Sequence, residues 1–542
     1  MLSVFGVRLF APAWQEAVSS SIGAKNPVLS GGVFLLTLRF LSEALTRGRP
    51  ASFTCFARDP AKTSNASAEP VWDKPIRART EQRTKNYMQS KTSNTDKIGA
   101  LRSLLRALRH RNFRLFFGGQ GISLIGTWMQ RVALGWLVYR LTDSAFWLGI
   151  IGFSSQFPTF LLAPFAGVLA DRWNRRHILL YTQTFSMIQA LILSALVLTD
   201  TTRVWHVIVL SIVLGVINGF DMPTRQSFMV EMVEDKADLG NAIALNSSMV
   251  NGARLLGPSM AGVLIALTGE GVCFLLNGCS YLAVILSLVL MRLPEKKTVS
   301  RQGRVLQQLA EGFRYALEFE PIRAILMLIA LISLTGMPYL ALLPVFAKDV
   351  LQGGADAFGY LMGSAGIGAL SGALYLASRK SVLGLGKMVP ISAATFGLSL
   401  MFFAFSRSFL FSLFLMGLTG FGQMVQLATG NTLLQTIVDD DKRGRVMSFY
   451  TMAFFGMTPI GSLIAGSLAV KIGVSWTVFL GGAACVSGAI AFARILPRLR
   501  AKTRPVYVRR GILPEIAEGL QHATELTLSE PLPATDVKKN GS

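Results

Sequence analysis

Four charged residues stand where the surrounding sequence does not favour them. Arg131, Asp221 and Arg254 lie within long apolar runs, and Asp171 lies in a segment rich in arginine. A charge at the centre of a membrane helix costs at least about 2.5–3.5 kcal/mol, so it usually faces a partner or an aqueous cavity. Side chains of this kind pair with one another, bind charged solutes or relay protons.

The composition indicates that these residues belong to a membrane protein. Of 542 residues, 51% are hydrophobic and 15% are charged, whereas soluble proteins carry about 25% charged residues. This composition excludes a disordered chain, a coiled coil, a collagen and a disulfide-stapled domain. The four cysteines contain no C-x-x-C pair, and Cys273 and Cys279 fall on different faces of one helix, so we expect no disulfide between them.

Long apolar runs recur after residue 113, separated by short polar segments. A helix that spans a bilayer needs about 20 mostly apolar residues, and these runs lack the alternation of a membrane barrel. The sequence therefore predicts an all-α membrane protein with twelve spans: 114–138, 145–169, 178–198, 204–224, 242–267, 271–291, 323–346, 357–377, 387–405, 409–430, 446–470 and 474–496.

The excess of basic residues, a net charge of +23, is uneven between the loops. Lysine and arginine concentrate in alternate loops, around residues 172–176, 225–236, 292–323, 379–387 and 442–445, and are sparse in the others. Basic loops stay on the cytoplasmic side. We therefore expect these loops and both termini in the cytoplasm of a bacterial-type inner membrane.

The chain also repeats itself at an offset of 204 residues, which predicts two six-helix pseudo-repeats in tandem. Five glycines recur in register: Gly252, Gly257, Gly262, Gly269 and Gly278 correspond to Gly456, Gly461, Gly466, Gly473 and Gly482. We expect six-helix bundles over 98–291 and 323–497, a cytoplasmic amphipathic linker over 292–322 and a cytoplasmic tail over 498–542.

Residues 1–97 are polar and basic and contain no clear signal peptide. Two interpretations stay open for this segment. It is either a disordered basic extension or a mis-annotated start, in which case translation begins at Met88. Peptides from residues 26–80 in a mass spectrum of the native protein would establish the extension.

The most specific motif is Gly167-Val168-Leu169-Ala170-Asp171-Arg172-Trp173-Asn174-Arg175-Arg176, between the second and third predicted spans. A glycine allows another helix to approach closely, and a carboxylate can accept hydrogen bonds from a helix N-terminus. A plain basic turn would explain Arg172 and Arg176, but not an acid among cations.

This decamer resembles the G-x-L-A-D-R-x-x-R-R loop of the major facilitator superfamily, as do the twelve spans and the basic central loop. Three further stretches resemble the branch that exports drugs, macrolides and enterobactin. They are Arg111–Phe116 with Gly126–Gln130, Asp221–Gln226, and Arg443–Ser448.

The resemblance implies a conformational latch made by Gly167, Asp171, Arg172, Arg175, Arg176 and Asp221. Asp171 would cap the helix that begins near residues 444–447, and Arg175 would pair with Asp221. The second-half copy is degenerate, with Ser371 for the glycine and Tyr375 for the aspartate. We therefore expect one working latch.

A central cavity between the halves is the second implied site. Arg254 precedes Gly257 and Pro258 in a pattern that resembles the family's antiporter motif with altered register. The alternative is a packing motif in which Arg254 binds helix carbonyls, and Arg131 is equally open to a structural reading. The cavity and coupling candidates are Gln130, Arg131, Arg254, Gly257, Pro258, Gln423 and Gln426, with Met337 and Tyr339 as further lining residues.

Other classes of protein lack support in the sequence. No Walker-type phosphate loop, metal-ligand spacing or nucleophile motif is present, so we expect neither an ATP-driven pump nor an enzyme. Basic loops at membrane edges are not a nucleic-acid surface. We expect no cofactor, no nucleic acid and a monomer in the lipid bilayer.

The expected function is secondary active export of small amphipathic molecules by alternating access, with proton antiport implied by the resemblance. The alternatives are a lipid or lysolipid flippase or a solute symporter on the same fold, and a membrane assembly partner that transports nothing. A carrier of acidic solutes should have paired cavity cations, and Arg131 and Arg254 are candidates for that pair.

Overall fold

A computed structural model describes residues 105–292, 314–379, 381–439 and 442–510, with only the backbone described at 163–164, 167–172 and 236. All of these residues belong to one compact unit, Lys91–Ser542. The predicted N-terminal segment 1–97, nearly all of the linker 292–322 up to residue 313, and the last part of the tail lie outside the described residues.

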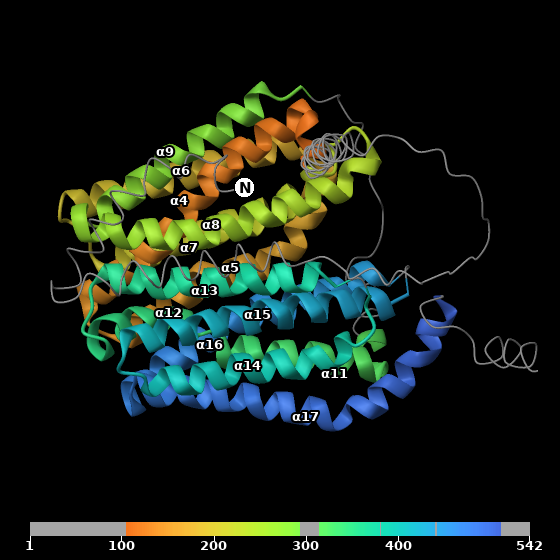
Figure 1. Ribbon diagram of the computed structural model, residues 1–542. Helices are drawn as coiled ribbons and strands as arrows, with labels where there is room; N and C mark the ends of the chain where they lie inside the picture. Colours follow the sequence, from red (N-terminus) through yellow and green to blue (C-terminus); the bar gives the residue numbers. More distant parts are fainter. Residues whose placement is uncertain (1–104, 293–313, 380, 440–441, 511–542) are drawn as a thin grey trace, which may run out of the picture. The chain divides into compact units, whose positions relative to one another are not determined.

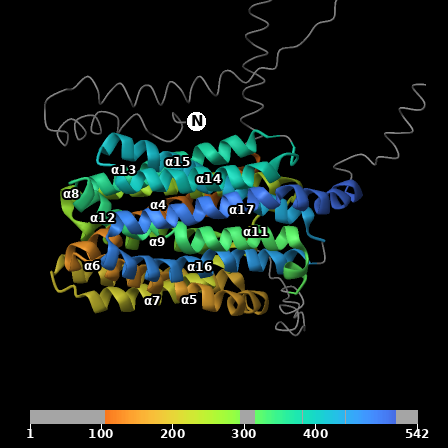
Figure 2. The ribbon, with the colours of Figure 1, turned by 90° about the horizontal axis from the view of Figure 1, so that it is seen from below.

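The described residues form helices without any strand. The long helices run side by side in both views, Figures 1 and 2. In chain order the elements are η3 (Arg106–Arg109), α4 (Arg111–Thr142), α5 (Ala145–Arg172), α6 (Arg175–Leu198), α7 (Val204–Met229), η4 (Lys236–Asp238), α8 (Leu239–Thr268), α9 (Glu270–Leu290), α11 (Glu320–Leu331), η5 (Ile332–Gly336), α12 (Tyr339–Val345), η6 (Phe346–Val350), α13 (Ala355–Ala377), α14 (Leu385–Phe405), α15 (Phe409–Ile437), α16 (Arg443–Ile472) and α17 (Val474–Arg509).

Eleven of these segments are long and apolar enough to cross a membrane, which confirms the predicted helical membrane class. One of the eleven, Glu320–Val350, combines α11, η5, α12 and η6. Helix α4 has 32 residues but is not among the eleven. It carries Gln120, Gln130 and Arg131 along its length. Whether α4 is a twelfth span therefore stays a prediction.

Two helices depart from the predicted boundaries. The segment Glu320–Val350 contains the π-helical turns η5 and η6, next to Pro338 and Pro344. A proline lacks the N–H that continues an α-helix, so irregular turns beside it are expected. Helix α17 continues to Arg509, so the predicted tail begins inside a helix. Glu320 holds this extension through Lys502 at 2.5 Å.

The first six long helices, α4–α9, pack mainly on one another, and so do the helices from α11 to α17. Two helix pairs make the largest contacts between these halves: α5 packs on α16, and α8 packs on α13. Each pair meets at glycines. A Cβ on Gly149 would lie 2.6 Å from the Ser462 carbonyl oxygen, and one on Gly262 would lie 3.0 Å from Gly359 Cα. We call these contacts the glycine seams.

The repeat predicted from the sequence has a counterpart in the backbone at its two tight turns. Gly269 has φ +82° and joins α8 to α9, and Gly473 has φ +86° and joins α16 to α17. Left-handed φ values favour glycine because it has no Cβ. Gly262 and Gly466, another pair at this offset, each lie in one of the two seams. These positions support two related halves.

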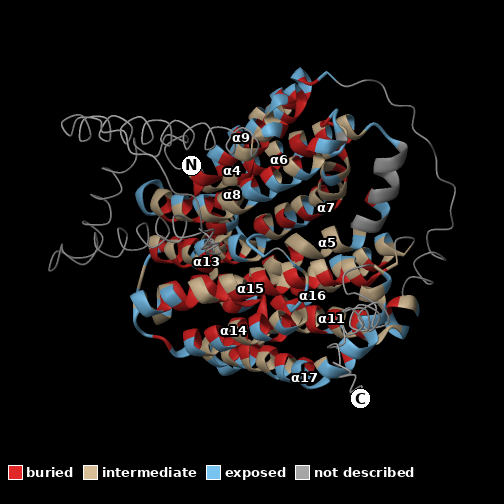
Figure 3. Ribbon diagram, turned by 45° about the vertical axis from the view of Figure 1, so that its right-hand side comes forward, coloured by how far each residue is buried: buried red, intermediate tan, exposed pale blue. Residues whose placement is uncertain are grey.

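Burial follows the helix faces (Figure 3). Buried side chains are mostly apolar, with a minority of polar ones, whereas large apolar side chains such as Phe165, Leu267, Phe402 and Leu410 are more than half exposed. A soluble protein rarely exposes large apolar patches. This outward-facing apolar surface is typical of helices in lipid.

The helices define two ends of the bundle. We call the Asp349 end the one where α4 and η6 finish and α5 and α13 begin. We call the Asp238 end the opposite one, where α4 and α8 begin and α5 and α7 finish. By the charge distribution of the loops, the Asp238 end is the one predicted to face the cytoplasm.

Candidate functional site

The predicted latch begins in the last turns of α5. Gly167, Asp171 and Arg172 belong to that helix, but their side chains lie outside the described residues. The capping of α16 by Asp171 therefore stays a prediction. The turn that follows is described: the Asn174 side chain caps α6 by accepting from the Arg176 backbone N–H at 3.0 Å. Arg176 also donates to the Val289 carbonyl at 2.9 Å.

The ion pair expected between Arg175 and Asp221 is not the one that forms. Arg175 Nη1 lies 2.7 Å from Glu231 Oε1. Glu231 follows the end of α7, level with the start of α6, so it is within reach of Arg175. Asp221 lies about three turns earlier in the chain, inside α7, and Arg175 does not pair with it in this structure.

Asp221 is held by other partners in the first half. It is 4% exposed, and its Oδ1 accepts from Gln183 at 2.7 Å and from Thr182 at 3.0 Å. Its Oδ2 lies 3.5 Å from Arg225 Nη2, one turn along α7. The carboxylate thus joins α6 to α7. This arrangement supports the structural interpretation of Asp221 over a role in carrying protons.

Arg131 and Arg254, predicted as a possible cation pair, share one aromatic partner. The Cζ atom of Arg131 lies 4.6 Å from the ring centre of Trp128, and that of Arg254 lies 5.7 Å from it. Cations attract the negative face of an indole ring. Arg254 also donates to Gln423 Oε1 on α15 at 2.8 Å, so it connects the two halves of the bundle.

Gly257 and Pro258 explain how Arg254 reaches this position. A Cβ at Gly257 would lie 2.5 Å from Trp128 Cβ and 2.8 Å from the Ile125 carbonyl oxygen, so only glycine lets α8 lie against α4 there. Pro258 has no N–H for the Arg254 carbonyl four residues earlier. A Cβ at Gly366 on α13 would lie 3.1 Å from that carbonyl oxygen.

The opposite wall comes from the second half. Gln423, which is 3% exposed, accepts from Arg254 and donates to Met337 Sδ at 2.9 Å. The Tyr339 hydroxyl and both amide atoms of Gln426 are buried without a hydrogen-bond partner. Unsatisfied buried polar groups are rare and call for an explanation. Gln423 thus connects Arg254 to Met337, and a cavity lined by Met337, Tyr339, Gln423 and Gln426 stays a prediction.

Gln130 takes a different role from the cavity role that was predicted. It accepts from Asn277 Nδ2 at 2.5 Å and donates to Gln189 Oε1 at 3.2 Å, and it is 3% exposed. Gln189 in turn donates to the Leu210 carbonyl. This chain of hydrogen bonds joins α9, α4, α6 and α7. Gln130 therefore acts between helices of the first half, as buried polar residues in membrane bundles commonly do.

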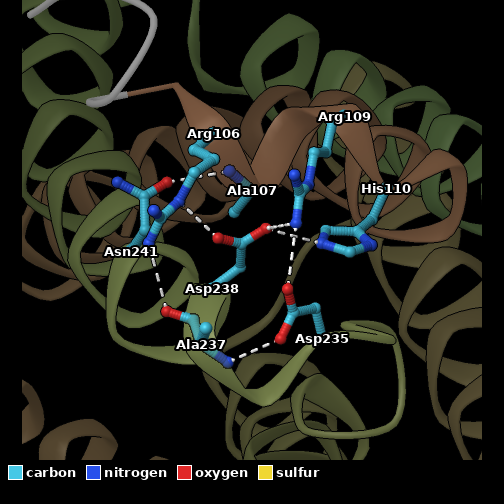
Figure 4. Close-up of polar contacts among 8 residues, drawn as sticks. All are labelled: Arg106, Ala107, Arg109, His110, Asp235, Ala237, Asp238 and Asn241. Carbon is cyan, nitrogen blue, oxygen red and sulfur yellow. Dashed lines mark hydrogen bonds and ion pairs between the residues drawn. The ribbon is translucent and has the colours of Figure 1, made fainter.

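Sequence reasoning missed a cluster around Asp238 (Figure 4). The buried carboxylate contacts Arg106, lies 2.8 Å from Arg109 and lies 2.9 Å from His110 Nε2. Burial favours the neutral acid, but the His110 hydrogen bond and the two arginines outweigh it and lower the pKa of Asp238. Asp238 stands among other acids, Glu231, Glu234 and Asp235, so no local pattern in the sequence singled it out.

The two halves are also joined at the Asp349 end. Tyr139 donates its hydroxyl proton to Asp349, and Lys348 Nζ lies 2.5 Å from Asp143 Oδ1. Both contacts connect α4 or its end to η6 in the other half. At the same end, Arg140 pairs with Glu270 at 2.9 Å within the first half. No metal-binding group of His, Cys, Asp or Glu occurs among the residues that were described.

The chain matches the MFS_3 family, described as transmembrane secretion effector, over residues 102–515. It is 28% identical to the staphyloferrin A transporter of Staphylococcus aureus, over 72% of this chain and 97% of the relative. It is 25% identical to the multidrug efflux pump Tap of Mycolicibacterium fortuitum, over 70% of this chain and 93% of the relative.

Solved structures agree on the fold. A POT family transporter in complex with a thioalcohol-conjugated peptide superposes with a TM-score of 0.58 at 12% identity, over 72% of this chain and 96% of that one. At this identity the likeness shows the fold alone. The helical bundle and the matched family agree, and the chain belongs to the transmembrane secretion effector family of major facilitator superfamily membrane transporters, not to an enzyme family.

Proposed function

We propose that this transporter exports small amphipathic molecules, such as drugs or siderophores, by alternating access and proton antiport. The names of the relatives support this range of cargo, since one is a staphyloferrin A transporter and another a multidrug efflux pump. The basic loops support a cytoplasmic location of the Asp238 end and of both termini. We count α4 as the twelfth span.

The observation that carries the proposal is where the halves touch. The glycine seams and the Tyr139–Asp349 and Lys348–Asp143 contacts lie toward the Asp349 end. The Arg254–Gln423 hydrogen bond joins the halves deeper in the bundle. Such a conformer is one member of an alternating-access pair, closed at the Asp349 end.

The seams suit a movement of this kind. Glycine contacts carry no long side chains that would have to disengage, and they let helix backbones pivot against each other. The joining contacts at the Asp349 end are one hydrogen bond and one exposed ion pair. Exposed ion pairs contribute about 0–1 kcal/mol, so these contacts can break during each cycle.

A cross-linking experiment tests alternating access directly. In a cysteine-free background, Asp143→Cys and Lys348→Cys would be joined by a short bifunctional thiol reagent with a reducible linker. We expect export of ethidium and erythromycin from a pump-deficient host to stop on cross-linking and to return on reduction. The physical reason is that the link holds the two halves together at the Asp349 end.

The matched control uses the neighbouring ion pair. Arg140→Cys and Glu270→Cys lie at the same end, but both belong to the first half. Cross-linking this pair should leave export nearly unchanged. Continued export with the Asp143–Lys348 cross-link complete would contradict alternating access as proposed here.

The latch and the coupling ion have separate tests. Asp171→Asn should abolish export at normal membrane expression, because the neutral amide removes the charge that would cap α16. A protonophore should abolish the wild-type export if protons drive it. Cellular accumulation of drugs that is unaffected by expression, alongside transbilayer movement of a labelled lysolipid, would instead favour a flippase on the same fold.

A further inference from the structure

We propose that Arg131 and Arg254 form an anion-binding site for the carboxylate of a small-molecule cargo. This inference rests on the proposed export function and narrows its substrate class. Its starting point is that Arg131 makes neither a hydrogen bond nor an ion pair with any residue that the structure describes. Trp128 is its one described polar or aromatic contact.

The guanidinium of Arg131 points into the bundle. Its side chain is exposed, yet its titratable neighbours are Arg254 on α8, the neutral Tyr281 on α9 and Arg225 on α7. Those helices surround α4 on its inner side, so the exposed group faces the space between helices rather than lipid. An arginine left unpaired at this depth is costly unless something else neutralises it.

The local charge balance is positive. Arg131 and Arg254 repel each other, and no carboxylate is among the described groups that act on either of them. Asp221 on α7 already accepts hydrogen bonds from Gln183 and Thr182 and forms an ion pair with Arg225. The two guanidinium groups near the Trp128 ring therefore have no described carboxylate to neutralise them, and a bound anion would do so.

The donors available suit a carboxylate. A guanidinium presents parallel N–H groups that match the two oxygens of a carboxylate, and such charge-assisted bonds are stronger than neutral ones. The buried Tyr339 hydroxyl has no hydrogen-bond partner and is free to donate one. Gln426 offers a further unpartnered amide on α15. These groups supply donors to oxygens that the two arginines do not reach.

Both halves of the bundle contribute to this site. Arg131, Trp128 and Arg254 come from α4 and α8, whereas Gln423 and Tyr339 come from α15 and α12. An anion bound between them would replace Gln423 as the partner of Arg254. Cargo binding would thereby change a contact that joins the two halves, which couples occupancy to movement.

The test measures binding of two dyes that share one ring system. Fluorescein carries a carboxylate, whereas rhodamine 123 is a cation in which that carboxylate is esterified. With the full-length protein in phosphatidylcholine nanodiscs, fluorescence polarisation should show fluorescein binding at least tenfold tighter than rhodamine 123. Arg131→Gln and Arg254→Gln should each weaken fluorescein binding about tenfold or more, since each removes a charge-assisted contact.

Controls separate charge from structure. Arg131→Lys keeps the charge and should retain more affinity than Arg131→Gln. Arg407→Gln alters an exposed arginine between α14 and α15 and should leave the affinity for fluorescein unchanged. Rhodamine 123 should bind both Gln variants at least as well as it binds the wild type, which shows that they remain folded.

The proposal is overturned by either of two results. One is that fluorescein fails to bind or binds no tighter than rhodamine 123. The other is that phosphatidylglycerol in the nanodisc displaces fluorescein completely, which would assign the site to a lipid headgroup. The export proposal and this inference can fail separately. Anion binding without efflux of drugs or anions would contradict the proposed function alone. Efflux of anions that remains intact in both Gln variants would contradict this inference alone.

Discussion

Two groups of arginines in this protein differ in what neutralises them. At the Asp238 end, Arg106 and Arg109 contact one buried carboxylate, which His110 also holds. Near the middle of the bundle, Arg131 and Arg254 share an indole ring, and Arg254 alone also binds a glutamine, with no described carboxylate at either arginine. The protein's own carboxylate neutralises the arginines at the Asp238 end, whereas the central arginines remain available to an anionic ligand, as proposed above.

The difference follows from where each group lies. The Asp238 cluster ties η3 to the turn before α8, together with the Asn241 side chain that accepts from the Ala107 N–H at 2.9 Å. Its arginines remain about half exposed, so only the acid is taken out of water. The central arginines lie within long helices, and a protein carboxylate there would compete with any anionic cargo.

The largest expected effect on stability comes from removing the acid. Asp238→Asn should lower the Tm of the purified protein at pH 7 by more than about 5 °C, because it leaves two arginines and His110 facing a buried neutral amide. Differential scanning fluorimetry in detergent measures this change. The neighbouring Asp235→Asn, at an exposed acid 3.1 Å from Arg109, serves as the control and should have a much smaller effect.

The pH dependence of this effect has a definite sign. Because the pKa of Asp238 is lowered in the folded state, its stabilising contribution is complete above its unfolded value near 3.8. The contribution is lost as the pH falls through the lower folded value. The Tm difference between Asp238→Asn and the wild type should therefore persist from pH 5 to pH 8 and be lost only in stronger acid. A difference that disappeared at pH 6 would contradict this assignment.

Gly257→Ala should have the next largest effect on stability. It should also disrupt the contact of Arg254 with Trp128 without replacing either arginine. The added Cβ would meet Trp128 Cβ and the Ile125 carbonyl, and overpacking of this kind typically costs about 1–3 kcal/mol. The variant should therefore also weaken fluorescein binding. Gly252→Ala on the same helix is the control, since a Cβ there meets nothing within 4 Å.

The sequence identified both Arg131 and Arg254 as unusual, but it did not predict that both would contact Trp128. A charge inside an apolar run is a local signal, and it identified Arg131, Asp221 and Arg254. Their contacts depend on how α8 lies against α4, which a single close approach at Gly257 determines. The helical class and family followed from periodic apolar runs and the decamer motif, because such patterns are local.

The errors have the same cause. Gln130 was expected in a cavity, and Arg175 was expected to pair with Asp221. In each case the residue type correctly indicated a polar contact between helices. The sequence did not indicate which helix face, or which depth in the bundle, the contact would occupy. Asp238 was not predicted, because its partner His110 lies 128 residues earlier in the chain. Long-range packing between η3 and the turn before α8 makes this cluster, and no pattern within either segment specifies it.

Arg131→Leu should change the stability of the protein in the opposite direction to Asp238→Asn. Removing an unpaired charge from the interior relieves its repulsion with Arg254, so the Tm of the ligand-free protein should rise by up to a few degrees. Fluorescein should bind this variant poorly. A lower Tm for both Arg131→Leu and Arg131→Gln would show that Arg131 supports the fold and is not held in reserve for a ligand.

The smallest effect is expected at a cation that is paired but exposed. Lys348 lies 2.5 Å from Asp143, and their side chains are 42% and 68% exposed. Surface pairs typically contribute about 0.2–1 kcal/mol, so Lys348→Gln should shift the Tm very little. If this variant were instead as unstable as Asp238→Asn, pairing alone would account for both sites. A small shift means that stability at the Asp238 cluster comes from burial of the carboxylate, with the arginines needed to make that burial possible.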